Sequence, residues 1–149
     1  MNVYFDTSAI VPILIAEPPS EACRQLWDDA DQRISSPLAY VEVAAALAMA
    51  ERQERLTAED RSQAWAGFAA IWPDVHQVDL TAELLAQAAD LARSQSLRAY
   101  DAVHCASALA VSDSELVAAT GDTRLLAAWR DLDLATHDTN LQNEAESDG

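Results

Sequence analysis

The chain has 149 residues, 50% of them hydrophobic, and a formal net charge of −16 from 25 acidic and 9 basic residues. This length predicts one domain with a full hydrophobic core, and no apolar run is long enough to span a membrane. Every basic residue is an arginine. Because proteins bind polyanions by neutralising phosphates with Lys and Arg, this composition argues against a broad nucleic-acid surface.

The N-terminal residues and the cysteines indicate a cytoplasmic protein. Residues 1–6 contain neither the basic region nor the cleavage site of a signal peptide. Cys23 and Cys105 lie far apart in the sequence, without the spacing of a redox or zinc motif. We therefore expect both cysteines to be reduced and buried as small hydrophobic residues.

In chain order, short β-prone segments alternate with pairs of amphipathic helices. Residues 2–6 are rich in Val, Tyr and Phe and predict a buried strand that ends at Asp6. Thr7 and Ser8 offer an N-cap for the helix that follows, and Pro37 opens the longest helix. The predicted strands are residues 2–6, 34–36, 75–80, 115–120 and 132–135. The predicted helices are residues 9–15, 20–30, 37–55, 57–72, 82–95, 98–112 and 123–130.

This order predicts an α/β fold in which a parallel sheet of four to five strands is flanked by helices in three layers. We place the domain at residues 1–137. Residues 138–149 are polar and acidic and are expected to form a disordered tail.

Four acidic residues stand where an ionised carboxylate costs free energy. Asp6 ends the first strand, and Glu42 lies in the apolar helix after the second. Asp101 begins a nearly apolar helix, and Asp122 follows the fourth strand. Ligands of open α/β sheets bind beyond the carboxyl ends of the strands, so we expect the four side chains to converge there. An all-oxygen site of this kind suits Mg²⁺ and predicts a metal-dependent phosphodiesterase.

The segments around these acids resemble the PIN-domain nucleases, and among them the VapC-type toxins of bacterial toxin–antitoxin pairs. The resemblance extends over residues 1–136, and it is carried by four motifs in the same order. These are Tyr4-Phe5-Asp6-Thr7-Ser8-Ala9, Ser36-Pro37-Leu38-Ala39-Tyr40-Val41-Glu42-Val43, Leu97-Arg98-Ala99-Tyr100-Asp101-Ala102-Val103-His104 and Ala119-Thr120-Gly121-Asp122.

The resemblance implies a ribonuclease in which Asp6, Glu42, Asp101 and Asp122 are catalytic and ligate Mg²⁺ or Mn²⁺. Ser8 and Thr120 match positions with a hydroxyl that orients these ligands. The implied partners are an RNA substrate and a small VapB-type antitoxin. We also expect a homodimer, because the alanine-rich face of residues 44–50 allows close helix contact, although core packing accounts for these alanines equally well.

Several side chains have two interpretations. Arg98 either contacts a substrate phosphate or pairs with an acid. For Asp101 considered alone, a helix cap is the commoner role. His104 is expected to be packed or hydrogen-bonded rather than a catalytic base. Trp27, Trp65, Trp72 and Trp129 are expected in the core or at a dimer contact rather than in base stacking.

Two other function classes are compatible with an acidic α/β domain. A phosphoacceptor domain or a haloacid-dehalogenase-like phosphatase normally requires a lysine near the phosphoryl group, and this chain has none. A PIN-like scaffold that binds partners without catalysis remains the alternative, although all four acids are present.

Overall fold

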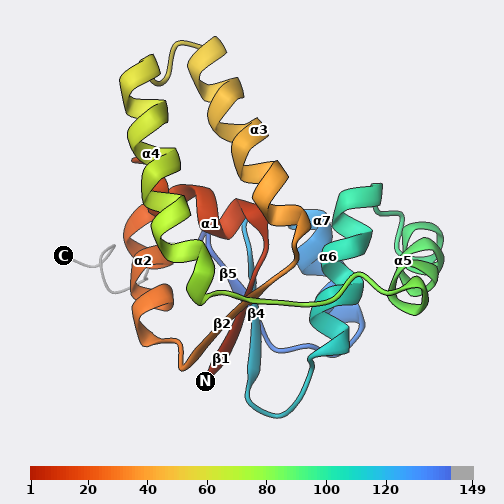
Figure 1. Ribbon diagram of the computed structural model, residues 1–149. Helices are drawn as coiled ribbons and strands as arrows, with labels where there is room; N and C mark the ends of the chain where they lie inside the picture. Colours follow the sequence, from red (N-terminus) through yellow and green to blue (C-terminus); the bar gives the residue numbers. More distant parts are fainter. Residues whose placement is uncertain (142–149) are drawn as a thin grey trace.

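The computed structural model describes residues 1–141, and residues 142–149, which include most of the predicted tail, lie outside the described range. A parallel sheet of five strands forms the centre, in the order β3-β2-β1-β4-β5 (Figure 1). The strands are β1 (Asn2–Phe5), β2 (Gln32–Ser35), β3 (His76–Gln77), β4 (Leu116–Thr120) and β5 (Thr136–Asp138). The predicted α/β class with a parallel central sheet is therefore confirmed.

Helices cover both faces of this sheet. They are α1 (Thr7–Leu14), α2 (Ser20–Asp29), α3 (Leu38–Arg52), α4 (Ala58–Ile71), α5 (Ala82–Ser94), α6 (Ala99–Ala110) and α7 (Thr123–Asp131), with a 3₁₀ turn η1 at Trp72–Asp74. Side chains of β1 alternate between the two faces, as the period of a strand requires. Val3 and Phe5 pack with α1 to α4, whereas Tyr4 packs with α5 to α7. The three-layer arrangement is thus present, with one core on each side of the sheet.

Most of the predicted helices and strands are present, with small shifts at their ends. The clearest error is the last strand, which lies at 136–138 rather than at 132–135. The earlier residues complete the C-terminal turn of α7 instead: the Asp133 backbone has a φ of 66°, and the Leu134 N–H donates to the Trp129 carbonyl. The structured domain also continues beyond residue 137, since Thr139 is only 2% exposed.

The N-cap of α1 differs from the sequence prediction, whereas Asp101 has its expected place in the first turn of its helix. The N-cap of α1 is Asp6, whose carboxylate accepts from the Ala9 N–H, rather than Thr7 or Ser8. Asp101 is not a cap, because α6 begins after Arg98 and Asp101 lies inside its first turn. The predicted second and third strands also differ, since β2 begins at Gln32 and β3 shortens to two residues at the sheet edge.

The aromatic residues pack largely as expected. Trp27 and Trp129 are buried in the two cores. Trp65 and Trp72 are partly buried and contact an aromatic group formed with Tyr40 and Phe68. Cys23 and Cys105 are free and buried. In the part of the chain that the structure describes, no helix is long and apolar enough to cross a membrane.

Candidate metal centre at the carboxyl edge of the sheet

The sheet topology brings the first and last of the predicted acids together. Strand order reverses between β1 and β4, and such a switch point is where α/β sheets bind ligands, beyond the carboxyl ends of the strands. Asp6 directly follows β1, and its N–H donates to the Ala119 carbonyl of β4. Asp122 lies two residues after β4 and is the N-cap of α7. Both carboxylates therefore lie at the same edge.

Asp6 is the most buried acid of the group, with 4% of its surface exposed. Its Oδ1 accepts hydrogen bonds from the Ser8 hydroxyl at 2.7 Å and from the Ala9 N–H at 3.1 Å. Its Oδ2 accepts from the Thr120 hydroxyl at 2.7 Å. Ser8 and Thr120 thus both donate to the carboxylate that the sequence suggested they orient.

Burial raises the pKa of Asp6 to about 6 from an ordinary value of 3.8. The charge of His104 and the hydrogen bonds from Thr120, Ser8 and Ala9 all act in the opposite direction. Desolvation therefore outweighs these interactions, and the ionised form of Asp6 is costly unless a positive charge is added nearby.

The turn between β4 and α7 fixes the second acid. Asp122 Oδ1 accepts from the N–H groups of Arg124 and Leu125, at 3.0 and 2.9 Å, as an N-cap does. The preceding Gly121 donates its N–H to the Ser8 hydroxyl oxygen at 2.7 Å, and Asn140 donates its amide to the Gly121 carbonyl at 2.7 Å. The turn is therefore tied both to the start of α1 and to the segment after β5.

Glu42 reaches the site from the second turn of α3, with 23% of its side chain exposed. Its Oε1 accepts from the Thr7 hydroxyl at 2.9 Å and lies 2.5 Å from His104 Nε2. Because Thr7 follows Asp6 in the chain, this contact joins α3 to the edge that carries Asp6.

Asp101 is partly buried in the first turn of α6, and no hydrogen bond from any described residue reaches its carboxylate. Burial raises its pKa, and the charges of Asp122 and Glu42 raise it further, against the lowering effects of His104 and Arg98. Asp101 therefore experiences the charges of two of the other acids directly. Within residues 1–141 the expected convergence of the four carboxylates is therefore seen as electrostatic coupling of Asp101 to Asp122 and Glu42, and not as a closed cluster of acids.

The donor set fits a hard divalent cation in an open site. Glu42 and Asp122 each have one oxygen that accepts two hydrogen bonds and a second that accepts none from the described residues. No arginine forms an ion pair with any of the four acids within residues 1–141. In the same range, however, no three His, Cys, Asp or Glu side chains are close enough to enclose a metal ion. The residues thus offer free carboxylate oxygens, which Mg²⁺ prefers, without a closed cage.

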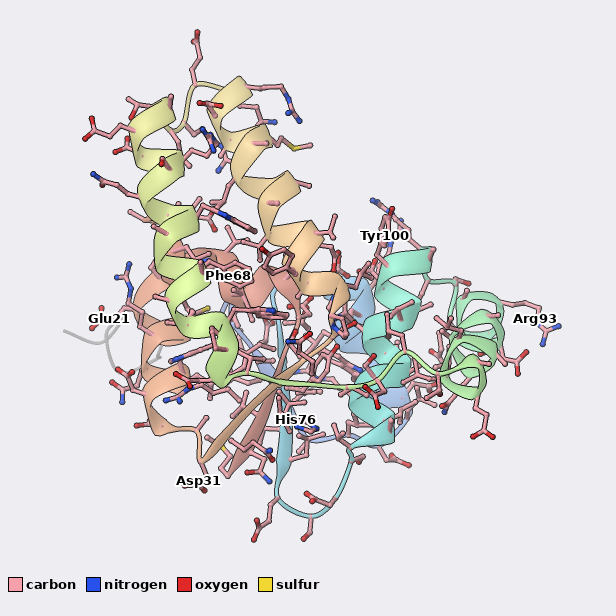
Figure 2. The ribbon with its side chains drawn as sticks, in the orientation of Figure 1. Glu21, Asp31, Phe68, His76, Arg93 and Tyr100 are labelled. Carbon is pink, nitrogen blue, oxygen red and sulfur yellow. The ribbon has the colours of Figure 1, made fainter. Side chains whose placement is uncertain are left out.

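The remaining predicted residue, Arg98, is exposed at the N-terminal end of α6 and forms no ion pair with a described residue. It acts on Asp101 only through its charge, which lowers that carboxyl's pKa. Tyr100, 61% exposed, lies at the same end of α6, whereas Arg93 projects from the outer side of α5 (Figure 2).

His104 is buried and hydrogen-bonded, as expected, but the sequence did not predict its partners or the contact of Thr7. Thr7 and His104 both bind Glu42, and the Tyr4 hydroxyl lies 2.8 Å from His104 Nδ1. His104 follows Asp101 by three residues on one helix, so helical periodicity could have placed it near the acids. Asn140 fell in the predicted tail, where nothing in the sequence marks a structural role.

This chain is similar to known proteins in both sequence and fold. The PIN domain family matches residues 3–143. Ribonuclease VapC45 and Ribonuclease VapC49 of Mycobacterium tuberculosis, from strains CDC 1551 / Oshkosh and ATCC 25618 / H37Rv, are each 47% identical over 123 residues, which is 83% of this chain and 85% of each relative. The chain therefore belongs to the PIN-domain family and, within it, to the VapC ribonucleases.

Solved structures of lower identity have the same fold. FitAcB from Neisseria gonorrhoeae has a TM-score of 0.64 at 21% identity, with 93% of this chain and 99% of that chain covered. VapC20 of Mycobacterium tuberculosis, described as a sarcin-ricin loop cleaving toxin, has a TM-score of 0.64 at 18% identity, with 85% and 95% covered. VapBC2 from Rickettsia felis, bound to a DNA fragment from their promoter, has a TM-score of 0.59 at 13% identity, with 93% and 98% covered.

Proposed function

We propose that this protein is a cytoplasmic toxin that hydrolyses RNA phosphodiester bonds internally with Mg²⁺ or Mn²⁺ and is inhibited by a cognate antitoxin. The observation that carries the proposal is the set of carboxylates at the switch point of the sheet. Two of them keep one oxygen that accepts no hydrogen bond from residues 1–141. Membership among the VapC ribonucleases supports the choice of RNA as substrate.

Each acid has a distinct role in this proposal. Asp6, held by Ser8 and Thr120, and Asp122, held by its own helix, present fixed oxygens to the cation. Asp101 on α6 and Glu42 on α3 complete the set of ligands. When bound, the cation supplies positive charge that offsets the charge developing on the phosphate oxygens. Arg98, exposed beside Asp101, contacts a flanking phosphate and so helps to hold the RNA.

The direct test is cleavage of a labelled single-stranded or looped RNA by the purified protein. We expect cleavage with Mg²⁺ or Mn²⁺, loss of cleavage with EDTA, and recovery when metal is added in excess. Cleavage that persists in EDTA would contradict the metal requirement. The alternative, a non-catalytic scaffold, predicts that RNA is bound but stays intact at every metal concentration.

An apolar groove supports the antitoxin part of the proposal. It lies between the end of α1 and helix α4, and it is lined by Ile13, Leu14, Ile15, Leu56, Ala64, Gly67 and Ile71, with Asp60 and Gln63 at polar positions. A small antitoxin would lay an apolar helix in this groove and extend an Arg or Lys toward the acidic edge. Gly67→Glu should weaken inhibition without affecting RNA cleavage, whereas Gly67→Ala should leave inhibition intact. Unchanged inhibition of Gly67→Glu would exclude this groove.

We also propose that the protein is a homodimer that uses α3. Val41 and Met49 are 64% and 50% exposed on this helix, and alanines lie between them. Light scattering after gel filtration should give twice the chain mass of 16.1 kDa. A monomer at micromolar concentration would contradict this assignment.

A further inference from the structure

Beyond the four carboxylates, we propose that His104 is a positioning residue that holds one oxygen of Glu42 and so turns the other toward the cation. Tyr4, in turn, holds the imidazole of His104 in the required orientation. This inference rests on the proposed function, because it concerns how one ligand of the same site is arranged.

The contacts form a chain through the inside of the molecule. Tyr4 in β1 and His104 in α6 are 0% and 1% exposed, and their polar atoms lie 2.8 Å apart. His104 Nε2 then lies 2.5 Å from Glu42 Oε1 in α3. The two rings also pack edge to face, with centroids 5.9 Å apart. The chain thus connects the sheet, α6 and α3, which are far apart in the sequence.

The direction of these hydrogen bonds follows from the groups themselves. An ionised carboxylate can only accept, so His104 Nε2 carries the proton that it shares with Glu42. In the neutral ring, Nδ1 is then an acceptor, and the Tyr4 hydroxyl donates to it. Glu42 therefore selects the tautomer that carries its proton on Nε2, and the Tyr4 hydroxyl, which can donate or accept, matches that tautomer by donating to Nδ1.

These hydrogen bonds distinguish the two carboxylate oxygens of Glu42. Thr7 and His104 both donate to Oε1, and no described residue donates to Oε2. Asp122 shows the same division, with two backbone N–H groups on Oδ1. A glutamate has three rotatable bonds, and these donors remove much of the freedom that it would lose on binding a cation. Metal sites commonly rely on such outer hydrogen bonds, whose loss weakens binding or activity about 10- to 100-fold.

The test separates positioning from packing by comparing two substitutions of His104 in the full-length protein. His104→Gln keeps an N–H donor near the position of Nε2, whereas His104→Leu fills similar space without a donor. Mn²⁺ binding is measured by isothermal titration calorimetry, and melting temperature is measured without metal. We expect His104→Leu to bind Mn²⁺ about 10- to 100-fold more weakly and His104→Gln to recover most of that loss.

Tyr4→Phe and Thr7→Val extend the test, and they decide it if His104→Leu does not fold. Each should weaken Mn²⁺ binding by a smaller factor, because each removes one donor from the chain or from Oε1. For His104→Leu, Tyr4→Phe and Thr7→Val, kcat for RNA cleavage should fall while KM for RNA stays within about twofold of the wild type, because the site geometry is lost and RNA binding is kept.

Two failures can be told apart. If wild-type protein binds no Mn²⁺ or binds it equally well after Asp6→Asn, the proposed metal site itself is wrong. If wild-type binding depends on Asp6 but His104→Leu or Tyr4→Phe binds Mn²⁺ as tightly as wild type, the metal site stands and the positioning role of His104 is overturned.

Discussion

At the scale of single residues, the site centres on the carboxylate of Asp6. The fold orients this carboxylate with hydrogen bonds but also removes it from water. Asp6 caps α1 and accepts three hydrogen bonds, yet burial raises its pKa to about 6. The hydrogen bonds hold its orientation, while the desolvation cost remains for a cation to offset. The sequence identified this residue because an acid that ends a buried strand is unusual.

The pH dependence of the stability of the metal-free protein tests the desolvation cost of Asp6. Between pH 3.8 and about 6 the unfolded chain loses the Asp6 proton while the folded chain keeps it. The Asp6 contribution to stability therefore falls as pH rises through this window and stays low above it, by up to about 3 kcal/mol. Asp6→Asn should match wild type near pH 4 and melt at a higher temperature at pH 8.

Chemical denaturation in EDTA at several pH values measures this difference. Saturating Mg²⁺ should stabilise wild type much more than Asp6→Asn at pH 8, because ligand binding to the folded state adds to stability. An Asp6→Asn variant that is less stable than wild type at pH 8 without metal would show that the hydrogen bonds outweigh the burial cost.

Arg98 gives a second prediction at the residue scale. Since this guanidinium is exposed beside Asp101 and forms no ion pair with a described residue, Arg98→Gln should raise KM for RNA several-fold and leave the melting temperature unchanged. Arg93→Gln is the matched control, because Arg93 pairs with exposed Asp90 on α5. Equal KM values for the two variants, measured by steady-state cleavage, would remove Arg98 from the substrate contacts.

At the scale of helices and strands, the β4–α7 turn is the most constrained part of the site. A Cβ at Gly121 would lie 2.9 Å from the Thr139 hydroxyl and 3.5 Å from that of Ser8. The backbone of Gly121 does not have a positive φ, so the constraint is close approach rather than conformation. The turn, the start of α1 and the segment after β5 are therefore packed as one unit.

Gly121→Ala should consequently destabilise the protein by about 1–3 kcal/mol, the usual range for overpacking. It should also reduce cleavage, because Ser8 orients Asp6. Gly67→Ala is the control, since a Cβ there meets no atom within 4 Å in the middle of α4. That substitution should stabilise the protein by about 0.5–1 kcal/mol. The free energy of unfolding of both variants is measured by thermal and urea unfolding. If the two substitutions change it in the same direction, this account of the turn is wrong.

The sequence predicted helices and strands well where local pattern and tertiary packing agree. The strand predicted at 115–120 and the helix predicted from Thr57 are examples, and the structure has both within about one residue. It failed at the last strand, where Leu132 and Leu134 are apolar because they pack into the core beside α7, not because they form a strand. The true strand, β5, is polar and lies at the sheet edge, so its sequence carries no alternation of apolar residues.

The same distinction applies to the site. Acids at the ends of strands were visible because they interrupt apolar segments. The Tyr4–His104–Glu42 contacts were not, because they depend on which faces of β1, α6 and α3 meet. Such pairings across about 60 and 100 residues follow from the topology rather than from any local pattern.

At the scale of the whole molecule, the charge of −16 limits how RNA is held. With so few cations, the protein neutralises few phosphates, and few counterions are released on binding. KM for single-stranded RNA should therefore change by only about threefold between roughly 50 and 200 mM salt at constant Mg²⁺. A change of about 100-fold in steady-state cleavage assays would indicate an extensive basic surface, which could come only from a partner.

The central claim, that these carboxylates hold the cation that cleaves RNA, is tested most directly by Asp101→Asn. The substitution keeps the shape of the side chain and removes one charge from an acid whose pKa is raised by burial and by Asp122. With saturating Mg²⁺, the account predicts a cleavage rate lower by about 100-fold or more in a protein that still unfolds cooperatively. Asp90→Asn, at an exposed position remote from the site, should cleave like wild type. Cleavage by Asp101→Asn at the wild-type rate would contradict the account.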